Sequence, residues 1–291
     1  MNFSIIIPTF QNFDFLKFTI ESINKNSSHK HEIIVHINGK DELTENYLTE
    51  NNHKFTKSEK NIGLCSGVNL ATKLSTHDYI LYAHDDMYFL PKWDEHLANE
   101  VNIHKHNKFY LSMTQISHTI GEKGNVQHIH FNCGDSLKNF NLNKLLNEYD
   151  KFEFRDLQGS HWAPHLVHKE MWERVGGFSE EFNPGDGSDP DFCMKLWNNK
   201  VRVFKTISKF KVCHFGSITT RKSNVKLNNG TKTFLLKFGF NPRFFRKYYL
   251  KGEKVEIYNG PLEDPGFSFN ILYDLIINKC KFLYHYMVSK K

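Results

Sequence analysis

The first hundred residues alternate between short apolar runs and longer amphipathic segments. Apolar runs of strand length occupy residues 3–10, 31–37, 54–59 and 79–84. The segments between these runs have the pattern of helices, most clearly at 14–26, where apolar residues recur three and four positions apart. Strands that alternate with helices in this way predict an α/β fold with a mostly parallel, Rossmann-like central sheet flanked by helices.

Polar or turn-forming pairs stand where three of the predicted strands end. These pairs are Pro8-Thr9, Asn38-Gly39 and Asp85-Asp86. Open parallel sheets bind their ligands in the crevice beyond the carboxyl ends of the strands. We therefore expect the three pairs to converge on one crevice.

The character of the chain changes after about residue 222. Residues 105–222 mix strand and helix patterns, whereas residues 223–291 are helical, aromatic and basic. We expect one main domain over 1–222, in which 1–104 forms one half and 105–222 the other, and a C-terminal helical extension over 223–291. The extension either packs on the domain or lies against an anionic membrane surface, since its aromatic side chains stand beside lysines.

Composition argues against several classes of protein. No apolar run reaches the ~20 residues of a membrane-spanning helix, and the first ten residues lack the basic start of a signal peptide. The five cysteines lack the spacing of a zinc site or a disulfide framework, which favours a reducing cytoplasm. The net charge of +6 permits anionic partners without requiring them. Basic residues of the extension interleave with aromatic ones as on a solvated helix face, so nucleic-acid binding is not expected.

Three groups of polar residues are candidates for chemistry. Asp85 and Asp86 interrupt an apolar run, so they form either a solvated turn or ligands of Mg²⁺ or Mn²⁺, which prefer carboxylate oxygens. Asp189 and Asp191 open an apolar helix, and they either cap it or supply a general base. His214 ends a strand and is, by itself, an unremarkable histidine.

Taken in chain order, the motifs resemble those of inverting glycosyltransferases of family 2, which have the GT-A fold. The resemblance covers roughly residues 3–217 and rests on "IIIPTF", "NG", "NIGLCSGVN", "HDDM", "GGFSEEF", "DPDFCMKLW" and "HFGS". It implies a GT-A catalytic domain in which residues 1–104 bind the nucleotide and residues 105–222 bind the acceptor and carry the catalytic base.

The resemblance implies a role for each matched position. Asp86, in the place of the D-x-D-type motif, would bind the metal with His214, and Asp85 would lie beside the nucleotide. Asp189 would be the catalytic base, with Asp191 near the acceptor. The remaining contacts to the nucleotide-sugar would come from Pro8, Thr9, Phe10, Asn38, Asn61, Gly63, Gly67 and Asn69. Trp162, between the two halves of the site, either stacks on an acceptor sugar or fills the core.

Two positions depart from the family's pattern. Asn38 stands where an aspartate usually contacts the nucleobase, and an amide hydrogen-bonds a base with different donors and acceptors. Ser188 stands where a glutamate usually precedes the catalytic base, which bears on acceptor binding and on the tuning of that base.

The resemblance implies a metal-dependent, inverting glycosyltransferase that uses Mn²⁺ or Mg²⁺. The donor would be a nucleotide-diphosphate sugar, with a UDP-sugar favoured, and the acceptor a hydroxyl of a glycan or of a lipid-linked molecule. Surface polysaccharide or glycoconjugate synthesis is the expected context. The expected location is the cytoplasm, with peripheral contact to the inner face of the membrane through the extension as an added hypothesis.

Two alternatives remain from the sequence. A degenerate family member would bind a sugar nucleotide or glycan without turnover, a hypothesis to which the Ser188 and Asn38 departures give weight. A sugar nucleotidyltransferase also uses aspartate-bound Mg²⁺ on an α/β sheet. It would carry a phosphate loop rich in glycine and basic residues after its first strand, whereas "PTFQNFDF" is not such a loop.

Overall fold

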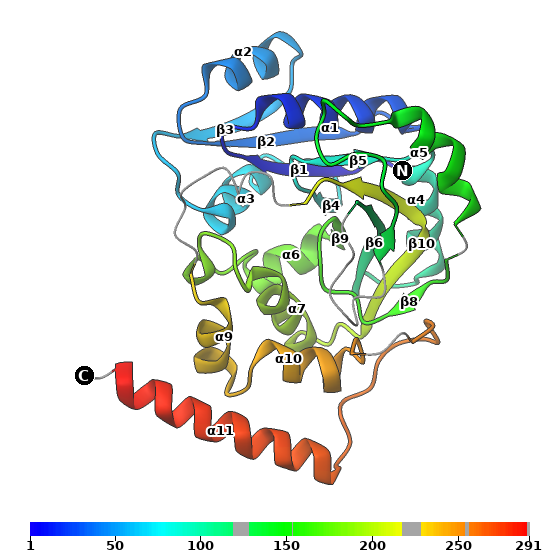
Figure 1. Ribbon diagram of the computed structural model, residues 1–291. Coiled ribbons are helices and arrows are strands. Elements are labelled where there is room, and N and C mark those ends of the chain that lie inside the picture. Colours follow the sequence, from blue (N-terminus) through cyan, green and yellow to red (C-terminus); the bar gives the residue numbers. More distant parts are fainter. Residues whose placement is uncertain (119–127, 153, 217–227, 254–255, 290–291) are drawn as a thin grey trace.

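The structure is a computed structural model that describes residues 1–118, 128–152, 154–216, 228–253 and 256–289. Among these residues, ten strands form one sheet whose main order is β3-β2-β1-β4-β9-β6-β10-β5, with β7 beside β6 and β8 beside β10 (Figure 1). The strands are β1 Ser4–Thr9, β2 Glu32–Asn38, β3 Lys54–Ser58, β4 Tyr79–Tyr82, β5 Met87–Phe89, β6 Phe109–Ser117, β7 His128–His130, β8 Leu157–Gln158, β9 His165–His168 and β10 Val203–His214.

The sheet joins a parallel half to a mixed half. Strands β1 to β4 are mutually parallel, because each is reached through a helical crossover of the kind that parallel neighbours require. Strand β9 then lies antiparallel between β4 and β6, and β5 lies antiparallel on the edge of β10. The expected α/β fold is confirmed, and the antiparallel pairs are confined to the second half of the order.

Helices cover both faces of this sheet (Figure 1). The helices are α1 Phe13–Asn26, α2 Glu42–Glu50, α3 Leu64–Thr72, α4 Trp93–Ile103, α5 Leu142–Glu148, α6 Lys169–Val175, α7 Ser188–Asn198, α9 Gly230–Phe238, α10 Pro242–Phe244 and α11 Phe269–Ser289. A π-helical turn, Phe245–Tyr249, continues α10. None of the helices in the described residues is long and apolar enough to cross a lipid bilayer.

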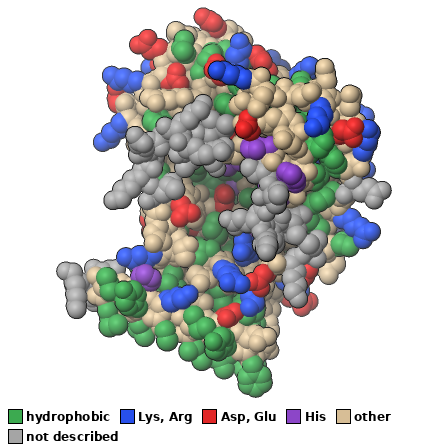
Figure 2. Space-filling view, in the orientation of Figure 1, with side chains coloured by type: hydrophobic (Ala, Val, Ile, Leu, Met, Phe, Trp, Pro, Cys, Tyr) green, Lys and Arg blue, Asp and Glu red, His purple; other side chains and the backbone are tan. Residues whose placement is uncertain are grey.

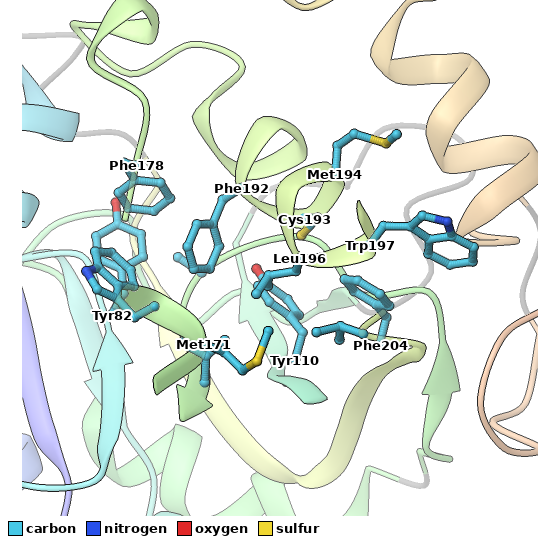
Figure 3. Packing of buried hydrophobic residues seen from close by; sticks show 14 of the residues in the cluster. Tyr82, Tyr110, Met171, Phe178, Phe192, Cys193, Met194, Leu196, Trp197 and Phe204 are labelled. Atoms are coloured by element: carbon cyan, nitrogen blue, oxygen red, sulfur yellow. The ribbon is translucent and has the colours of Figure 1, made fainter. Parts of the chain in front are cut away.

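Alternation along the strands divides the core into two large clusters. Ile6 of β1 packs with α3, α6 and α7, whereas Ile5 and Ile7 pack with α1 and α4 on the opposite face. In the first cluster, aromatic residues of α7 and of the segment before it stack above the strands; Figure 3 shows Phe178 and Phe192 beside Tyr82 and Tyr110. This packing fixes the N-terminus of α7 above the carboxyl ends of the strands.

Strand β10 differs from the prediction. The sequence pattern predicts two strands, at 201–207 and 209–215, but the structure has one strand, Val203–His214. Its pairing with β6 shifts register between Ile207 and Lys211, so the apparent break in the pattern is a bulge within a continuous strand.

The C-terminal segment packs on the α7 side of the sheet. Phe234 of α9, together with Phe244 and Phe245, belongs to the same apolar cluster as α7, and α11 lies against α9. The expected domain boundary at residue 222 lies outside the described residues, so the division into 1–222 and 223–291 stays a prediction.

Candidate functional site

The three strand ends converge as expected. Thr9 at the end of β1 donates a hydrogen bond from Oγ1 to Asp85 Oδ2 at 2.7 Å, after β4. At the end of β2, Gly39 has a φ of 102°, and a Cβ on it would stand 3.4 Å from the ring of Phe10. Pro8, Thr9 and Phe10 therefore lie between the β2 turn and the two aspartates.

Asp85 and Asp86 form a buried pair of carboxylates. They are 6% and 3% exposed, respectively, in the segment that joins β4 to β5. Burial, and then the charge of Asp86, raise the pKa of the Asp85 carboxyl well above its usual range. The solvated turn weighed as an alternative is therefore wrong, because the two side chains point into the protein.

His84, Asp86 and His214 form a cluster that fits a metal ion. Pairing of β5 with β10 sets His214 opposite Met87, and His214 Nε2 lies 3.0 Å from Asp86 Oδ1. One ligand atom from each of the three residues lies within 4.8 Å of the other two. For a metal–ligand distance of about 2.1 Å, adjacent ligands of an octahedral ion stand about 3.0 Å apart, so the Asp86–His214 separation matches.

The third member of this cluster, His84, was not among the predicted metal ligands. Burial and the neighbouring His214 lower the pKa of His84 to about 4, which keeps its imidazole neutral, the form that binds metals. Its position two residues before Asp86 was the available signal. The sequence alone does not reveal the β5–β10 pairing that turns these neighbours into a site with His214.

The predicted nucleotide loop 61–69 is held mainly by contacts within the protein. The Oδ1 atom of Asn183 accepts the Cys65 N–H at 3.0 Å and thereby caps α3. A Cβ on Gly63 would stand 2.3 Å from that same oxygen, and a Cβ on Gly67 would stand 2.5 Å from the His36 ring. Both glycines therefore serve close packing, and the capped helix terminus is already occupied by an amide oxygen.

Three asparagines of the predicted nucleotide site, Asn69, Asn61 and Asn38, form hydrogen bonds to backbone groups of the protein. Asn69 exchanges hydrogen bonds with the backbone of Phe178, from Nδ2 to the carbonyl oxygen at 2.8 Å and from the Phe178 N–H to Oδ1 at 2.9 Å. Asn61 Oδ1 accepts the Gly63 N–H at 2.9 Å. Asn38 Oδ1 accepts the Ile62 N–H at 2.7 Å, which leaves its amide nitrogen as a donor with no partner among the described residues.

Asp189 lines a cavity of about 530 Å³ beside the sheet. It stands in the first turn of α7, and burial raises its pKa to about 7. Trp162, the predicted sugar platform, lines the same cavity. Buried Tyr82 lies near both parts of the site. Its pKa is raised first by burial and further by the negative charges of Asp189, Asp85 and Asp86.

Asp191 does not line this cavity and has partners within the protein. Its buried carboxylate lies 2.7 Å from Lys237 Nζ of α9 and 3.7 Å from Lys195 Nζ. Ser188, in the place of the usual glutamate, donates from Oγ to the Gly185 carbonyl at 2.7 Å and closes the turn before α7. These contacts give both residues a role in fixing the helix that carries Asp189.

Further residues of this cavity were not predicted. They include Gln115, His161, Arg243 and Arg246. The three-residue spacing of the two arginines in "PRFFR" places them on one side of a helical turn. That spacing was visible in the sequence, but nothing there connects the C-terminal segment to Asp189. In Figure 2, histidine and acidic side chains gather around the hollow in the middle of this face.

Comparison with known proteins gives the family. The profile described as glycosyl transferase family 2 matches residues 4–176, more than half of the chain. No curated protein sequence matches this chain.

Solved structures share the fold at low sequence identity. S. aureus TarS 1-349 has a TM-score of 0.55 and 15% identity over 74% of this chain and 60% of that one. The same protein in complex with UDP-GlcNAc has a TM-score of 0.59 and 13% identity, over 99% of this chain and 73% of that one. GalNAc-T7 with UDP, GalNAc and Mn²⁺ has a TM-score of 0.57 and 14% identity, over 81% of this chain and 47% of that one. The chain thus spans less than two thirds of several structures that it resembles.

Proposed function

We propose that this chain, which belongs to glycosyl transferase family 2, moves a sugar from a nucleotide-diphosphate sugar to an acceptor hydroxyl with inversion. The observation that carries the proposal is the arrangement of the site. A buried cluster of metal-ligand type and a cavity that holds a carboxylate whose pKa is about 7 both lie near Tyr82, whose pKa the charges of Asp189 and Asp86 help to raise. Complexes of the TarS structure with UDP and UDP-GlcNAc support a UDP-sugar as donor.

The donor end of the site would use the strand ends. His84, Asp86 and His214 would hold a divalent ion, Mn²⁺ or Mg²⁺, which when bound neutralises charge on the diphosphate leaving group. The Mn²⁺ in the GalNAc-T7 structure supports this choice of ion. Phe10 and the amide nitrogen of Asn38 would face the nucleobase, where that nitrogen can donate to a carbonyl oxygen.

Asp189 would act as the general base. Its carboxylate takes the proton of the acceptor hydroxyl while that oxygen forms a bond to the anomeric carbon. The bond from the anomeric carbon to the diphosphate oxygen breaks on the opposite face of the sugar, so the configuration inverts. A pKa of about 7 suits this task, because a base works best when its pKa lies near the working pH.

A panel of nucleotide-sugars incubated with the protein and Mn²⁺ tests this function. We expect release of the nucleoside diphosphate from one of them, with kcat at least ~10²-fold lower in Asp189→Asn and Asp86→Asn. Asp78→Asn, on the exposed turn before β4, is the control for the loss of one charge. Binding without turnover in the native protein would make it a degenerate family member, whereas release of pyrophosphate from a nucleoside triphosphate and a sugar 1-phosphate, in a parallel assay, would make it a nucleotidyltransferase.

The outer face of α11 supports contact with an anionic membrane, and hence a lipid-linked acceptor. Its inner face is anchored, since Asn278 Oδ1 accepts the Asn241 N–H at 2.9 Å and Lys247 Nζ lies 2.9 Å from Asp274. The outer face is an apolar stripe whose members are 42% to 83% exposed: Phe269, Leu272, Tyr273, Ile276, Leu283, Tyr284 and Met287. Figure 2 shows hydrophobic side chains gathered over α11.

Charge favours a membrane as the partner of this stripe. Exposed Lys279 and Lys281 flank it on either side of Cys280, as cations do on helices that lie in the headgroup region. A helix of 21 residues presents about 30 Å of this surface. The catalytic domain would then sit at the inner face of the membrane, within reach of lipid-linked acceptors.

Co-sedimentation with vesicles tests the membrane contact. We expect the native protein to bind vesicles that contain phosphatidylglycerol, and the triple variant Tyr273→Ser, Ile276→Ser, Leu283→Ser to remain in solution. The double variant Leu43→Ser, Ile103→Ser removes apolar side chains of similar exposure elsewhere and should bind like the native protein. Equal partitioning of native and triple variant would refute the contact, as would self-association of the native protein that the triple variant abolishes without any vesicle binding.

A further inference from the structure

One wall of the cavity beside Asp189 is basic and comes from the C-terminal segment. Asp189 comes from the start of α7 and Trp162 from the segment between β8 and β9, whereas α10 and the turn after it supply Arg243 and Arg246. Residues of the metal-type cluster are not among the described residues that line this cavity. The arginines therefore face the space next to the proposed general base and not the proposed metal.

Arg246 has no acidic partner among the described residues. Arg243 is paired with Glu253, with its Nη2 3.0 Å from Oε1, and Lys237 is paired with Asp191 and Glu181. The Nε atom of Arg246, in contrast, is buried without any hydrogen-bond partner. An unsatisfied donor of a charged group is costly, so a ligand that accepts from it gains an interaction that the protein itself does not provide.

His161 adds a second unpartnered polar atom to the same wall. Its Nδ1 is buried without a partner. Burial, and then the charge of Arg246, lower the pKa of His161 to about 4, and both side chains line the same cavity. The two side chains thus offer a cation and a neutral imidazole to the same cavity.

The acidic residues of the cavity do not neutralise Arg246. Asp186 directs Oδ2 to the Gly230 N–H at 2.8 Å, where it holds the start of α9. Burial raises the pKa of Asp189, and among the described residues no ion pair joins that carboxylate to a cation. The guanidinium and the base therefore occupy separate parts of a cavity whose volume, about 530 Å³, is that of a small-molecule site.

We infer that the acceptor is anionic, with a phosphate or carboxylate group that binds Arg246 while its hydroxyl reaches Asp189. A guanidinium is planar and binds either group through paired hydrogen bonds, which fixes the orientation of the acceptor as well as adding affinity. The inference rests on the proposed function, because it assigns this cavity to the acceptor.

Three hexoses that differ in one group test the inference: glucose 6-phosphate, glucuronate and glucose. Their dissociation constants are measured by saturation-transfer NMR on the full chain, with EDTA present so that no metal holds the phosphate, and at about 150 mM salt to screen nonspecific attraction. We expect at least one charged sugar to bind about tenfold or more tightly than glucose. The tighter of the two identifies phosphate or carboxylate as the natural group.

Variants locate the effect. Arg246→Gln should remove the preference for the charged sugar, and Arg246→Lys, which keeps the charge and loses the paired geometry, should retain part of it. Arg155→Gln removes an exposed arginine outside the cavity and should leave the preference unchanged. Thermal melting of each variant shows that it is folded.

The following results would overturn the inference. They are equal or undetectable binding of all three sugars, a preference that survives Arg246→Gln, and a preference that Arg155→Gln removes equally. Binding of UDP with Mn²⁺ is measured on the same protein preparations after the EDTA has been removed. If UDP and Mn²⁺ bind but the sugars show no preference, the acceptor inference alone fails, whereas a protein that binds neither loses the proposed function as well.

Discussion

Replacing the proposed base should make the protein more stable while it removes activity. Burial raises the pKa of Asp189 from 3.8 to about 7, which means that the folded protein disfavours the charged carboxylate. Each pKa unit corresponds to about 1.4 kcal/mol, so the full difference amounts to about 4 kcal/mol of unfolding free energy. Because the side chain is partly exposed to the cavity, solvent screening reduces the expected effect to roughly 1–3 kcal/mol.

The sign of this effect depends on pH in a defined way. Below about pH 4 the carboxyl is protonated in both states, and it costs no stability. Between pH 4 and 7 the Asp189 carboxyl ionises in the unfolded chain but stays largely protonated in the folded protein, so the free energy of unfolding falls as the pH rises. Above pH 7 the carboxyl is charged in both states, and the full loss of stability is present. Asp189→Asn carries no charge at any pH, so its unfolding free energy should exceed that of the native protein by more at pH 8 than at pH 5.

Urea denaturation at these two pH values measures the difference. Asp78→Asn, on an exposed turn, is the matched control, and its effect should stay within about 0.5 kcal/mol at both pH values. An Asp189→Asn variant that is less stable than the native protein at pH 8, or whose advantage does not grow with pH, would contradict the account of a desolvated base.

Three further predictions concern the same site. The rate of sugar transfer at saturating substrate should rise with pH and level off above a midpoint near 7, because only ionised Asp189 accepts the proton; a rate that falls over this range would contradict the assignment. His84→Ala should weaken Mn²⁺ binding at least tenfold in a titration followed by electron paramagnetic resonance. Binding of Mg²⁺ should be weakened less, since imidazole favours transition ions. Exposed His106→Ala is the control, and an equal loss of affinity for both ions would exclude ligation by His84. Gly67→Ala should lower the free energy of unfolding, measured by urea denaturation, by about 1–3 kcal/mol because its Cβ would stand 2.5 Å from the His36 ring. Gly266→Ala, with open space around the new Cβ, should leave the free energy of unfolding unchanged. A larger loss for Gly266→Ala than for Gly67→Ala would contradict the close approach of Gly67 to His36.

The parallel half of the fold could be predicted from local pattern, and the mixed half could not. Strands β1 to β4 alternate with helices, so their order of apolar and amphipathic segments carries the topology. Strand β9 runs directly into α6 at Lys169 with no turn residue between them, which hides it in a continuous sequence. Its insertion between β4 and β6 is a long-range pairing that no local pattern records.

The same limit explains which parts of the candidate site were found. Asp86, His214 and Asp189 lie in motifs whose order along the chain points to the family. His84 and Arg246 have no such motif, because their significance depends on partners that only the folded chain supplies or withholds. The motif predicted that Gly67 and Asn69 contact the nucleotide, yet in the structure Gly67 lies against His36 and Asn69 bonds to Phe178. The packing of helix α3 therefore also explains the spacing of these residues.

The bulge in β10 sets which side chain reaches the aspartate pair. Ile207 pairs with Met113 and Lys211 pairs with the next residue, Thr114, so residues 208–210 are additional to the ladder. An odd number of additional residues exchanges the two faces of the strand for everything that follows. An insertion of one residue in 208–210 that leaves the pairing before it unchanged is therefore expected to present Cys213 to Asp86 in place of His214, and titration with Mn²⁺ and Zn²⁺ would detect the exchange as a preference for the softer ion. The length of this bulge would thus determine, from several residues away along the strand, whether the protein prefers a harder or a softer ion.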